Sequence, residues 1–170
     1  GETAEPGKGP WLNYDFVPGD RVIFFEDFSK DVVGNFPQRL EFIEGNMEVA
    51  EWNKTRWLRA STKSYFAIPL PQELPPKFTL EFDFYGAARG WSQISVTGGE
   101  DTHPDQASMH FDITNVRAGM RAGSKELAIA AVDESAFGNV IHARLLGDGQ
   151  YLKMYFNEKR VANVPKADFI

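Results

Sequence analysis

The chain has 170 residues, of which 42% are hydrophobic and 25% are charged, with 24 acidic against 18 basic side chains. This composition is typical of one ordinary globular domain, and a chain of this length buries roughly 70% of the surface that its unfolded form exposes. The net charge of -6 argues against a protein that binds nucleic acid through clustered Lys and Arg. The absence of Cys excludes a thiol nucleophile and a thiolate zinc site. No apolar run approaches the roughly 18 residues that span a bilayer, so we expect a mature or trimmed soluble chain.

Residues 1–20 combine Gly and Pro with scattered aromatic residues. Such a segment resists regular structure, but its aromatic side chains have reason to dock on a protein surface. We predict an extended N-terminal arm over residues 1–20 that binds a partner through Trp11, Tyr14 and Phe16. Packing of the arm on the chain's own domain is the alternative.

From Arg21 onward, short runs rich in β-branched and aromatic residues alternate with Gly, Pro, Asn and Asp at a spacing of roughly 8 to 12 residues, the pattern of a β-sandwich or barrel. Thirteen candidate strands imply two packed sheets with almost no helix; the best candidate for a helical turn is the short segment 133–137. In chain order the candidate strands are RVIFFEDF, RLEFIEG, MEVAEW, RWLRAS, SYFAIPL, FTLEFDFYG, SQISVTG, SMHFDIT, RAGMRAG, ELAIAAV, IHARLLG, QYLKMYF and RVANVP.

The alternation of apolar and polar residues is cleanest between Phe78 and Tyr85. Successive side chains of a strand point to opposite faces, so Leu80, Phe82 and Phe84 share one face and are predicted to be core. Polar turn residues at 52–57 and 156–160 separate neighbouring candidate strands, and we expect a hairpin at each place.

The segments VIFFEDFSKDVVGNFPQRLEFIEGN, FTLEFDFYG and DGQYLKMYFNEKRVANVP resemble the concanavalin A-like jelly-roll superfamily. Together with PWLNYDFVPGDRV, they are more similar still to one branch, in which such a domain precedes an OmpA-like peptidoglycan-binding domain in bacterial envelope proteins. The resemblance covers roughly residues 10–170. It implies a periplasmic location, peripheral to a membrane.

We therefore predict an all-β fold, a concanavalin A-like jelly-roll sandwich of two antiparallel sheets over residues 21–170. Residues 166–170 begin an apolar run that stops unfinished. Because soluble proteins avoid unpaired sheet edges, we expect either further strands beyond Ile170 or an edge covered by the arm or a partner.

Some glycosidases of this superfamily carry the strand motif E-x-D-x-x-E or E-x-D-x-E, and retaining hydrolysis needs two carboxyl groups about 5 Å apart. Glu81 and Asp83 supply the beginning of that motif, but Tyr85 and Gly86 stand where the second Glu belongs. We predict no catalytic residues, and we interpret Glu81 and Asp83 as solvated positions on the outward face of a strand.

The sequence predicts no cofactor and no metal site. His103, His110 and His142 lack the spacing of zinc ligands. The acidic segment 100–105 is interpreted as a solvated loop, with a structural calcium ion as the weaker alternative, because calcium takes six or more oxygens. Phosphate-binding glycine loops and the G-x-S-x-G motif do not occur.

The remaining functional candidates are aromatic residues, because Trp and Tyr stack on sugars and also anchor protein interfaces. Trp52 and Trp57 flank the first predicted hairpin and Trp91 follows a Gly-rich segment, so we expect at least one of the three to be partly exposed.

The favoured function is a non-catalytic binding or scaffolding domain of the bacterial periplasm. It docks on another envelope protein or serves as an accessory subunit of a membrane protein complex. The alternative is a carbohydrate-binding module for peptidoglycan or another glycan, acting through Trp91, Tyr85, Glu81 and Asp83. A glycosidase is the least favoured interpretation, and no nucleic-acid partner is expected.

Overall fold

The computed structural model describes Phe16 and residues 18–86, 91–96, 109–114, 117–122, 125–132, 138–149 and 151–165, without the side chains of Trp91, Val96, Met109 and Ala130. Across these residues the fold is all-β, with twelve strands and several antiparallel sheets. None of the described residues forms a helix that is long and apolar enough to cross a membrane. The predicted helical turn at 133–137 lies outside the described residues.

Twelve of the thirteen predicted strands coincide with observed strands. They are β1 (Glu41–Glu44), β2 (Met47–Trp52), β3 (Thr55–Ala60), β4 (Tyr65–Ala67), β5 (Lys77–Tyr85), β6 (Trp91–Val96), β7 (Met109–Thr114), β8 (Arg117–Ala122), β9 (Lys125–Ala131), β10 (Val140–Asp148), β11 (Leu152–Phe156) and β12 (Lys159–Val164).

The prediction of a strand over residues 21–28 is wrong, because this segment is irregular. Its backbone is held by local side chains instead of a neighbouring strand, because the Phe28 N–H donates to Glu26 Oε1 at 2.7 Å and the Ser29 N–H donates to Asp27 Oδ1 at 3.0 Å. Phe28 also has a positive φ of 61°, which no regular strand allows. Local hydrogen bonds of this kind compete with sheet pairing, and here they prevail over the apolar composition.

The described chain divides into two compact units. The first, called the two-sheet unit, comprises Gly1–Gly19 and Pro75–Ile170, and the second, called the inserted unit, comprises Asp20–Leu74. The inserted unit therefore interrupts the two-sheet unit along the sequence. The sequence analysis places no boundary near Leu74, and the predicted arm over residues 1–20 stays a prediction.

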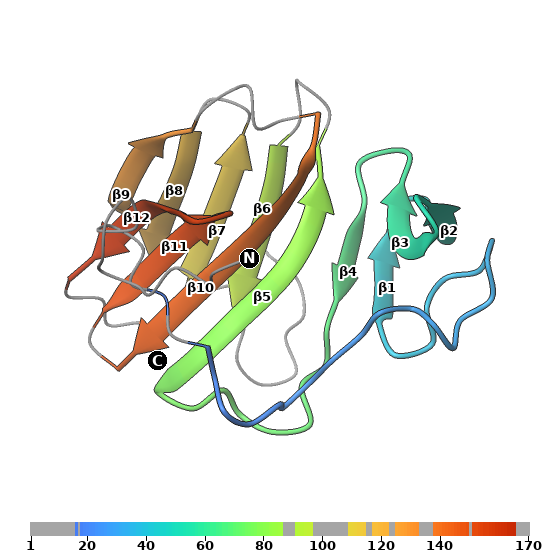
Figure 1. Ribbon diagram of the computed structural model, residues 1–170, viewed down its shortest axis with the longest axis horizontal. Helices are drawn as coiled ribbons and strands as arrows, with labels where there is room; N and C mark the ends of the chain where they lie inside the picture. The colour runs from blue at the N-terminus through green and yellow to red at the C-terminus, as the bar shows by residue number, and fades with distance from the viewer. Residues whose placement is uncertain are drawn as a thin grey trace, which may run out of the picture. The chain divides into compact units, whose positions relative to one another are not determined.

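The two-sheet unit contains two four-stranded antiparallel sheets. The first sheet has the strand order β12-β11-β10-β5 and the second has the order β6-β7-β8-β9. Figure 1 shows these sheets as two layers, and β12 of the first sheet lies against β8 and β9 of the second. Strands β5 and β10 are neighbours although the whole second sheet separates them in sequence.

The core of the two-sheet unit lies between the inward faces of the two sheets. It is formed mainly by Ile141, Ala143 and Leu145 of β10, by Leu152, Met154 and Phe156 of β11, and by Phe111, Ile113, Ala118 and Met120 of the second sheet.

The predicted alternation in β5 is confirmed, because Leu80, Phe82 and Phe84 pair with the buried residues Leu145, Ala143 and Ile141. These three side chains are only half-buried, however, while Phe78 on the same strand is buried. The reason is that β5 ends the strand order of the first sheet, so its inward side chains have neighbouring strands on one side only.

The inserted unit contains two separate two-stranded antiparallel sheets, β1-β4 and β2-β3. Its small core holds Met47, Val49, Leu40 and Pro37. The loop before β1 runs beside β2, because the Gly34 N–H donates to the Val49 carbonyl and the Val49 N–H donates to the Asn35 carbonyl, both at 2.8 Å.

Both predicted hairpins are confirmed. Trp52 pairs with Thr55 across the turn of the β2-β3 hairpin, where Asn53 and Lys54 have φ values of 49° and 61°. Two successive residues with positive φ give the turn type that best fits the twist of two-residue hairpins. In the β11-β12 hairpin, Asn157 takes the positive φ, at 52°.

Candidate functional site

The outward face of the first sheet carries the two carboxylates of the incomplete glycosidase motif. The Arg144 Nε donates to Glu81 Oε1 at 3.1 Å, and the His142 ring contacts the carboxylate of Asp83. Both pairs join directly opposed residues of β5 and β10. Each carboxylate therefore has a partly exposed cross-strand partner of opposite or potentially opposite charge, an arrangement that stabilises a strand pair modestly.

Phe16 covers part of this same face. Its side chain is 3% exposed, its ring stands edge-on to the Tyr155 ring with centroids 5.4 Å apart, and the Arg144 guanidinium lies 5.5 Å from its centroid. Tyr155 is fully buried although it belongs to the outward face, opposite Arg144. Phe16 thus packs on the chain's own sheet. Trp11 and Tyr14, the other two predicted partner-binding residues, lie outside the described residues.

The predicted glycan-binding residues come from two different sheets. Tyr85, Glu81 and Asp83 lie on the outward face of β5 in the first sheet, where Tyr85 is half exposed. Trp91 begins β6 in the second sheet, opposite Thr114, and its side chain lies outside the description. The structure brings the two carboxylates together with Arg144 and His142 on the face of β5 that also carries Tyr85. Glycan binding by these residues stays a prediction.

Exposed apolar side chains gather on the inserted unit. Of the eleven large hydrophobic side chains that are exposed among the described residues, nine belong to Asp20–Leu74. They are Val22, Phe25, Val32, Val33, Phe42, Trp52, Phe66, Ile68 and Leu70. A single exposed apolar residue needs no explanation, but neighbouring exposed apolar residues such as Phe42 and Phe66, which are opposed on β1 and β4, are typical of a surface that another molecule covers.

Two aromatic pairs stand out in this unit. Phe42 and Phe66 are paired across β1 and β4, and each is about half exposed. Trp52 and Trp57 pack edge to face across the base of the β2-β3 hairpin, with ring centroids 5.6 Å apart. The prediction that at least one of the Trp residues is partly exposed is confirmed by Trp52.

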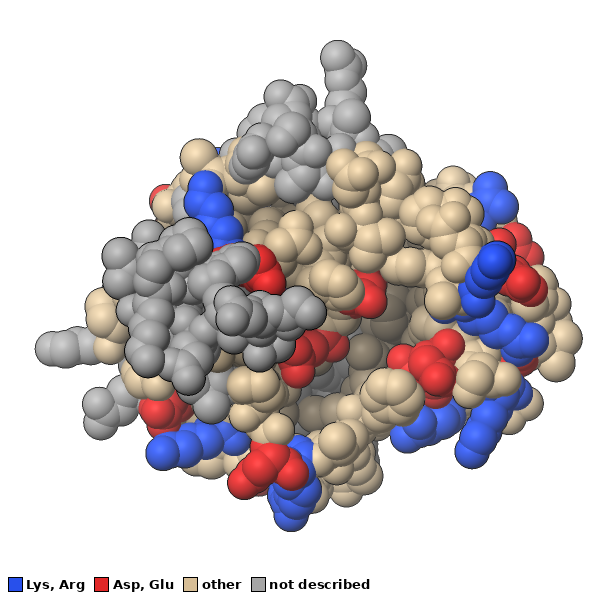
Figure 2. Space-filling model, viewed as in Figure 1, with Lys and Arg blue, Asp and Glu red and all other residues tan. Residues whose placement is uncertain are grey.

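Charged residues do not form a basic surface on the face shown in Figure 2. Where Lys and Arg side chains are visible among the described residues in that view, Asp and Glu side chains lie near them. Mixed charge of this kind surrounds apolar side chains at the rims of protein interfaces.

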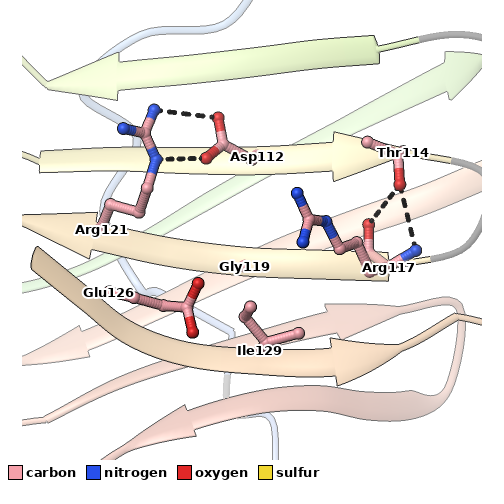
Figure 3. Close-up of a pocket in the computed structure, with 7 residues that line it drawn as sticks. All are labelled: Asp112, Thr114, Arg117, Gly119, Arg121, Glu126 and Ile129. Atoms are coloured by element: carbon pink, nitrogen blue, oxygen red, sulfur yellow. Dashed lines mark hydrogen bonds and ion pairs between the residues drawn. The ribbon is translucent and has the colours of Figure 1, made fainter. Parts of the chain in front are cut away.

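The outward face of the second sheet carries an open hollow of about 280 Å³. It is lined by Asp112 and Thr114 of β7, by Arg117, Gly119 and Arg121 of β8, and by Glu126 and Ile129 of β9 (Figure 3). Sequence reasoning did not find this site, because its residues come from three strands and are ordinary outward positions when each strand is read alone.

A hydrogen-bonded ion pair forms one side of the hollow. Arg121 Nε donates to Asp112 Oδ2 at 2.6 Å, and Gln93 Nε2 donates to Asp112 Oδ1 at 2.8 Å. Partial burial acts to raise the pKa of Asp112, but the hydrogen bonds from Arg121 and Gln93 and the charge of Arg121 outweigh it and hold that pKa below its usual value. The same pairing raises the pKa of Arg121. The pair is therefore charged and fixed in position at neutral pH.

The histidines occupy separate places. His110 is buried beside Ser95, whose hydroxyl lies 3.0 Å from the His110 Nδ1, and His142 pairs with Asp83. His103 and the acidic segment 100–105 lie outside the described residues. No group of three or more His, Asp or Glu placed to hold a metal ion occurs within the described ranges. The absence of a metal site and of a cofactor stays a prediction.

No protein-family model, no curated protein and no solved structure matches this chain. The resemblance to the concanavalin A-like superfamily stays a prediction.

Proposed function

We propose that the chain is a non-catalytic binding domain of the bacterial periplasm, in which a concanavalin A-like jelly roll supports a docking surface for an envelope or membrane-complex protein. The docking surface consists of the exposed apolar side chains of the inserted unit. The observation that carries this proposal is the concentration of nine of eleven exposed large hydrophobic side chains on that unit.

The strand order supports the jelly-roll part of the proposal. The two-sheet unit has eight strands in two antiparallel sheets, and the chain crosses to the second sheet after β5 and returns to pair β10 with β5. Eight strands in two packed antiparallel sheets match the strand number and layering of double-sheet jelly rolls, although β6 to β9 and β10 to β12 follow one another as neighbours within their own sheets.

The side chains around the incomplete motif support a role without catalysis. A retaining glycosidase needs a nucleophile and an acid at a defined separation, and here Tyr85 takes the place of the second carboxylate. Glu81 and Asp83 are instead held by Arg144 and His142. We expect no hydrolysis of a soluble β-glucan or of peptidoglycan, and turnover that disappears in Glu81→Gln would contradict this.

A protein partner fits the apolar surface better than a glycan does. Glycan sites need convergent hydrogen-bonding groups beside an aromatic ring, whereas protein interfaces combine Phe, Trp and aliphatic anchors with a mixed-charge rim. The exposed aromatic side chains of the inserted unit that suit such an interface are Phe25, Phe42, Phe66 and Trp52.

The test is co-purification from gently solubilised membranes with matched variants of the full chain. Phe42→Ser and Tyr85→Ser each remove one exposed ring, 51% exposed on the inserted unit and 50% exposed on the two-sheet unit. We expect Phe42→Ser to weaken capture of the partner and Tyr85→Ser to leave it unchanged. Melting curves of both variants confirm that each is folded. Equal capture by all three proteins, or equal loss in both variants, would overturn the docking surface.

A further inference from the structure

The floor of the hollow on the second sheet is formed in part by Gly119, which has no side chain to fill the space. Gly119 lies in the middle of β8, directly between Asp112 on β7 and Ile129 on β9. Its φ is not in the left-handed region, and a Cβ built there would meet Ala128 O at 3.4 Å and Ile129 Cγ1 at 3.7 Å, which are ordinary contacts. The backbone therefore does not require glycine here. A glycine inside a strand often marks a place where a ligand approaches the backbone closely.

A β-bulge places an acidic side chain at one end of the hollow. Met120 pairs with Ala128, but Arg121 pairs with Glu126, so Leu127 is the extra residue. Without the bulge, Glu126 would follow the inward alternation of Ala128, where an unpaired carboxylate is costly to bury. The bulge turns Glu126 to the outward face, where it is exposed and lines the hollow.

The two ends of the hollow have opposite charge. At one end, Asp112 and Arg121 neutralise each other and Glu126 adds a negative charge. At the other end lies Arg117, whose backbone N–H donates to the Thr114 hydroxyl at 3.1 Å. Its guanidinium forms no salt bridge or hydrogen bond with any described residue. The carboxylate of Glu126 likewise has no such partner among the described residues. Figure 3 shows the Arg117 and Glu126 side chains on either side of Gly119.

We propose that this hollow binds a short zwitterionic peptide, with the ligand's carboxylate on Arg117 and its ammonium group on Glu126. Between these charges, Gly119 and the half-exposed Ile129 offer a low, partly apolar floor for the small side chains of the ligand. The Arg117 guanidinium, which has no salt bridge to a described residue, suits a bidentate contact with a carboxylate.

The spacing of the charges sets the length of the ligand. Arg117 and Arg121, which is opposite Glu126, are four residues apart on one strand and therefore about 13 Å apart at the backbone. The side chains of Arg117 and Glu126 are long enough to lean toward the middle of the hollow. An extended peptide of about three residues, at roughly 3.3 Å each, therefore fits between their charged groups.

The hollow and the docking surface of the inserted unit share no residue. The inference is therefore independent of the proposed function, and either can fail alone.

The test titrates the full chain with trialanine while NMR records the amide shifts of β7, β8 and β9. Trialanine amide, N-acetyl-trialanine and the doubly blocked peptide serve as probes that lack one or both charges. We expect free trialanine to bind and each loss of a charge to weaken binding about tenfold, as expected for charge-assisted hydrogen bonds.

Variants assign the effect to the hollow. Arg117→Gln should remove the advantage of a free carboxylate, and Glu126→Gln should remove the advantage of a free ammonium group. Gly119→Leu should fill the floor and abolish binding, whereas Lys125→Gln, an exposed neighbour outside the hollow, should bind as the natural chain does. Absence of binding at millimolar trialanine, equal binding of the doubly blocked peptide, or unchanged binding by Arg117→Gln and Glu126→Gln would each overturn the proposal.

Discussion

The Phe16 ring packs edge-on against Tyr155 on the outward face of the first sheet, with centroids 5.4 Å apart, although 139 positions separate the two residues in sequence. Both rings are buried by this contact and by the sheet. The end of the N-terminal arm is thus structurally part of the two-sheet unit. The inserted unit follows Gly19 and ends before Pro75 in the sequence, and both of these residues belong to the two-sheet unit.

Phe16 should therefore contribute to stability. We expect Phe16→Ala to lower the free energy of unfolding by about 3 kcal/mol, as for other buried Phe residues, because the Tyr155 ring loses its cover. Phe25→Ala is the control, since Phe25 is exposed and should change the stability by less than about 0.5 kcal/mol. Urea denaturation measures both. Equal, small effects would show that the arm does not hold the sheet.

A Leu→Ala substitution can be compared at two positions of the same core that differ in burial, Leu145 and Leu80. They are directly opposed on β10 and β5, but Leu145 is buried and Leu80 is half-buried on the terminal strand. Leu145→Ala should cost about 2 to 5 kcal/mol and Leu80→Ala on the order of 1 to 2 kcal/mol. A larger loss for Leu80→Ala in denaturant melts would contradict the position of β5 at the end of the first sheet.

Two glycines in strand interiors should respond differently to alanine. At Gly147 a Cβ would lie 2.4 Å from the ring of Phe78, which is packed in the core, so Gly147→Ala should destabilise the protein by about 1 to 3 kcal/mol. At Gly119 the same change meets only ordinary contacts and should be neutral or stabilise by up to about 1 kcal/mol. Thermal melts of the two variants decide this, and a loss at Gly119 as large as that at Gly147 would refute it.

The Asp112–Arg121 pair should make the free energy of unfolding depend on pH in the acidic range. The pKa of Asp112 is lower in the folded chain than in the unfolded chain, so the unfolded state binds more protons as the pH falls below about 4. The stabilisation is present above that range and is lost as the pH falls through the folded pKa. Asp112→Asn should reduce the steepness with which stability is lost as the pH falls below about 4, measured by urea melts at several pH values. An unchanged slope would show that the pair contributes nothing to it.

Local patterns in the sequence were sufficient to predict the positions of twelve strands and of two hairpin turns. In β5 the alternation from Phe78 to Tyr85 identified both faces, because neighbouring side chains of any strand point to opposite sides. The hairpin at Asn53 and Lys54 followed from polar turn residues between two strands. The same logic failed for residues 21–28, where Glu26 and Asp27 bind the backbone and prevent strand pairing.

Only the tertiary structure decided which strands and residues meet. The pairing of β5 with β10 and the burial of Phe16 by Tyr155 join positions that are distant in sequence. The gathering of Asp112, Gly119 and Glu126 around one hollow depends on the register of three neighbouring strands. The alternation of a strand reports which face is apolar, but it carries no information on the neighbouring strand. The choice of the neighbouring strand depends on the packing of the whole core. The same packing determines which side chains come together on the surface.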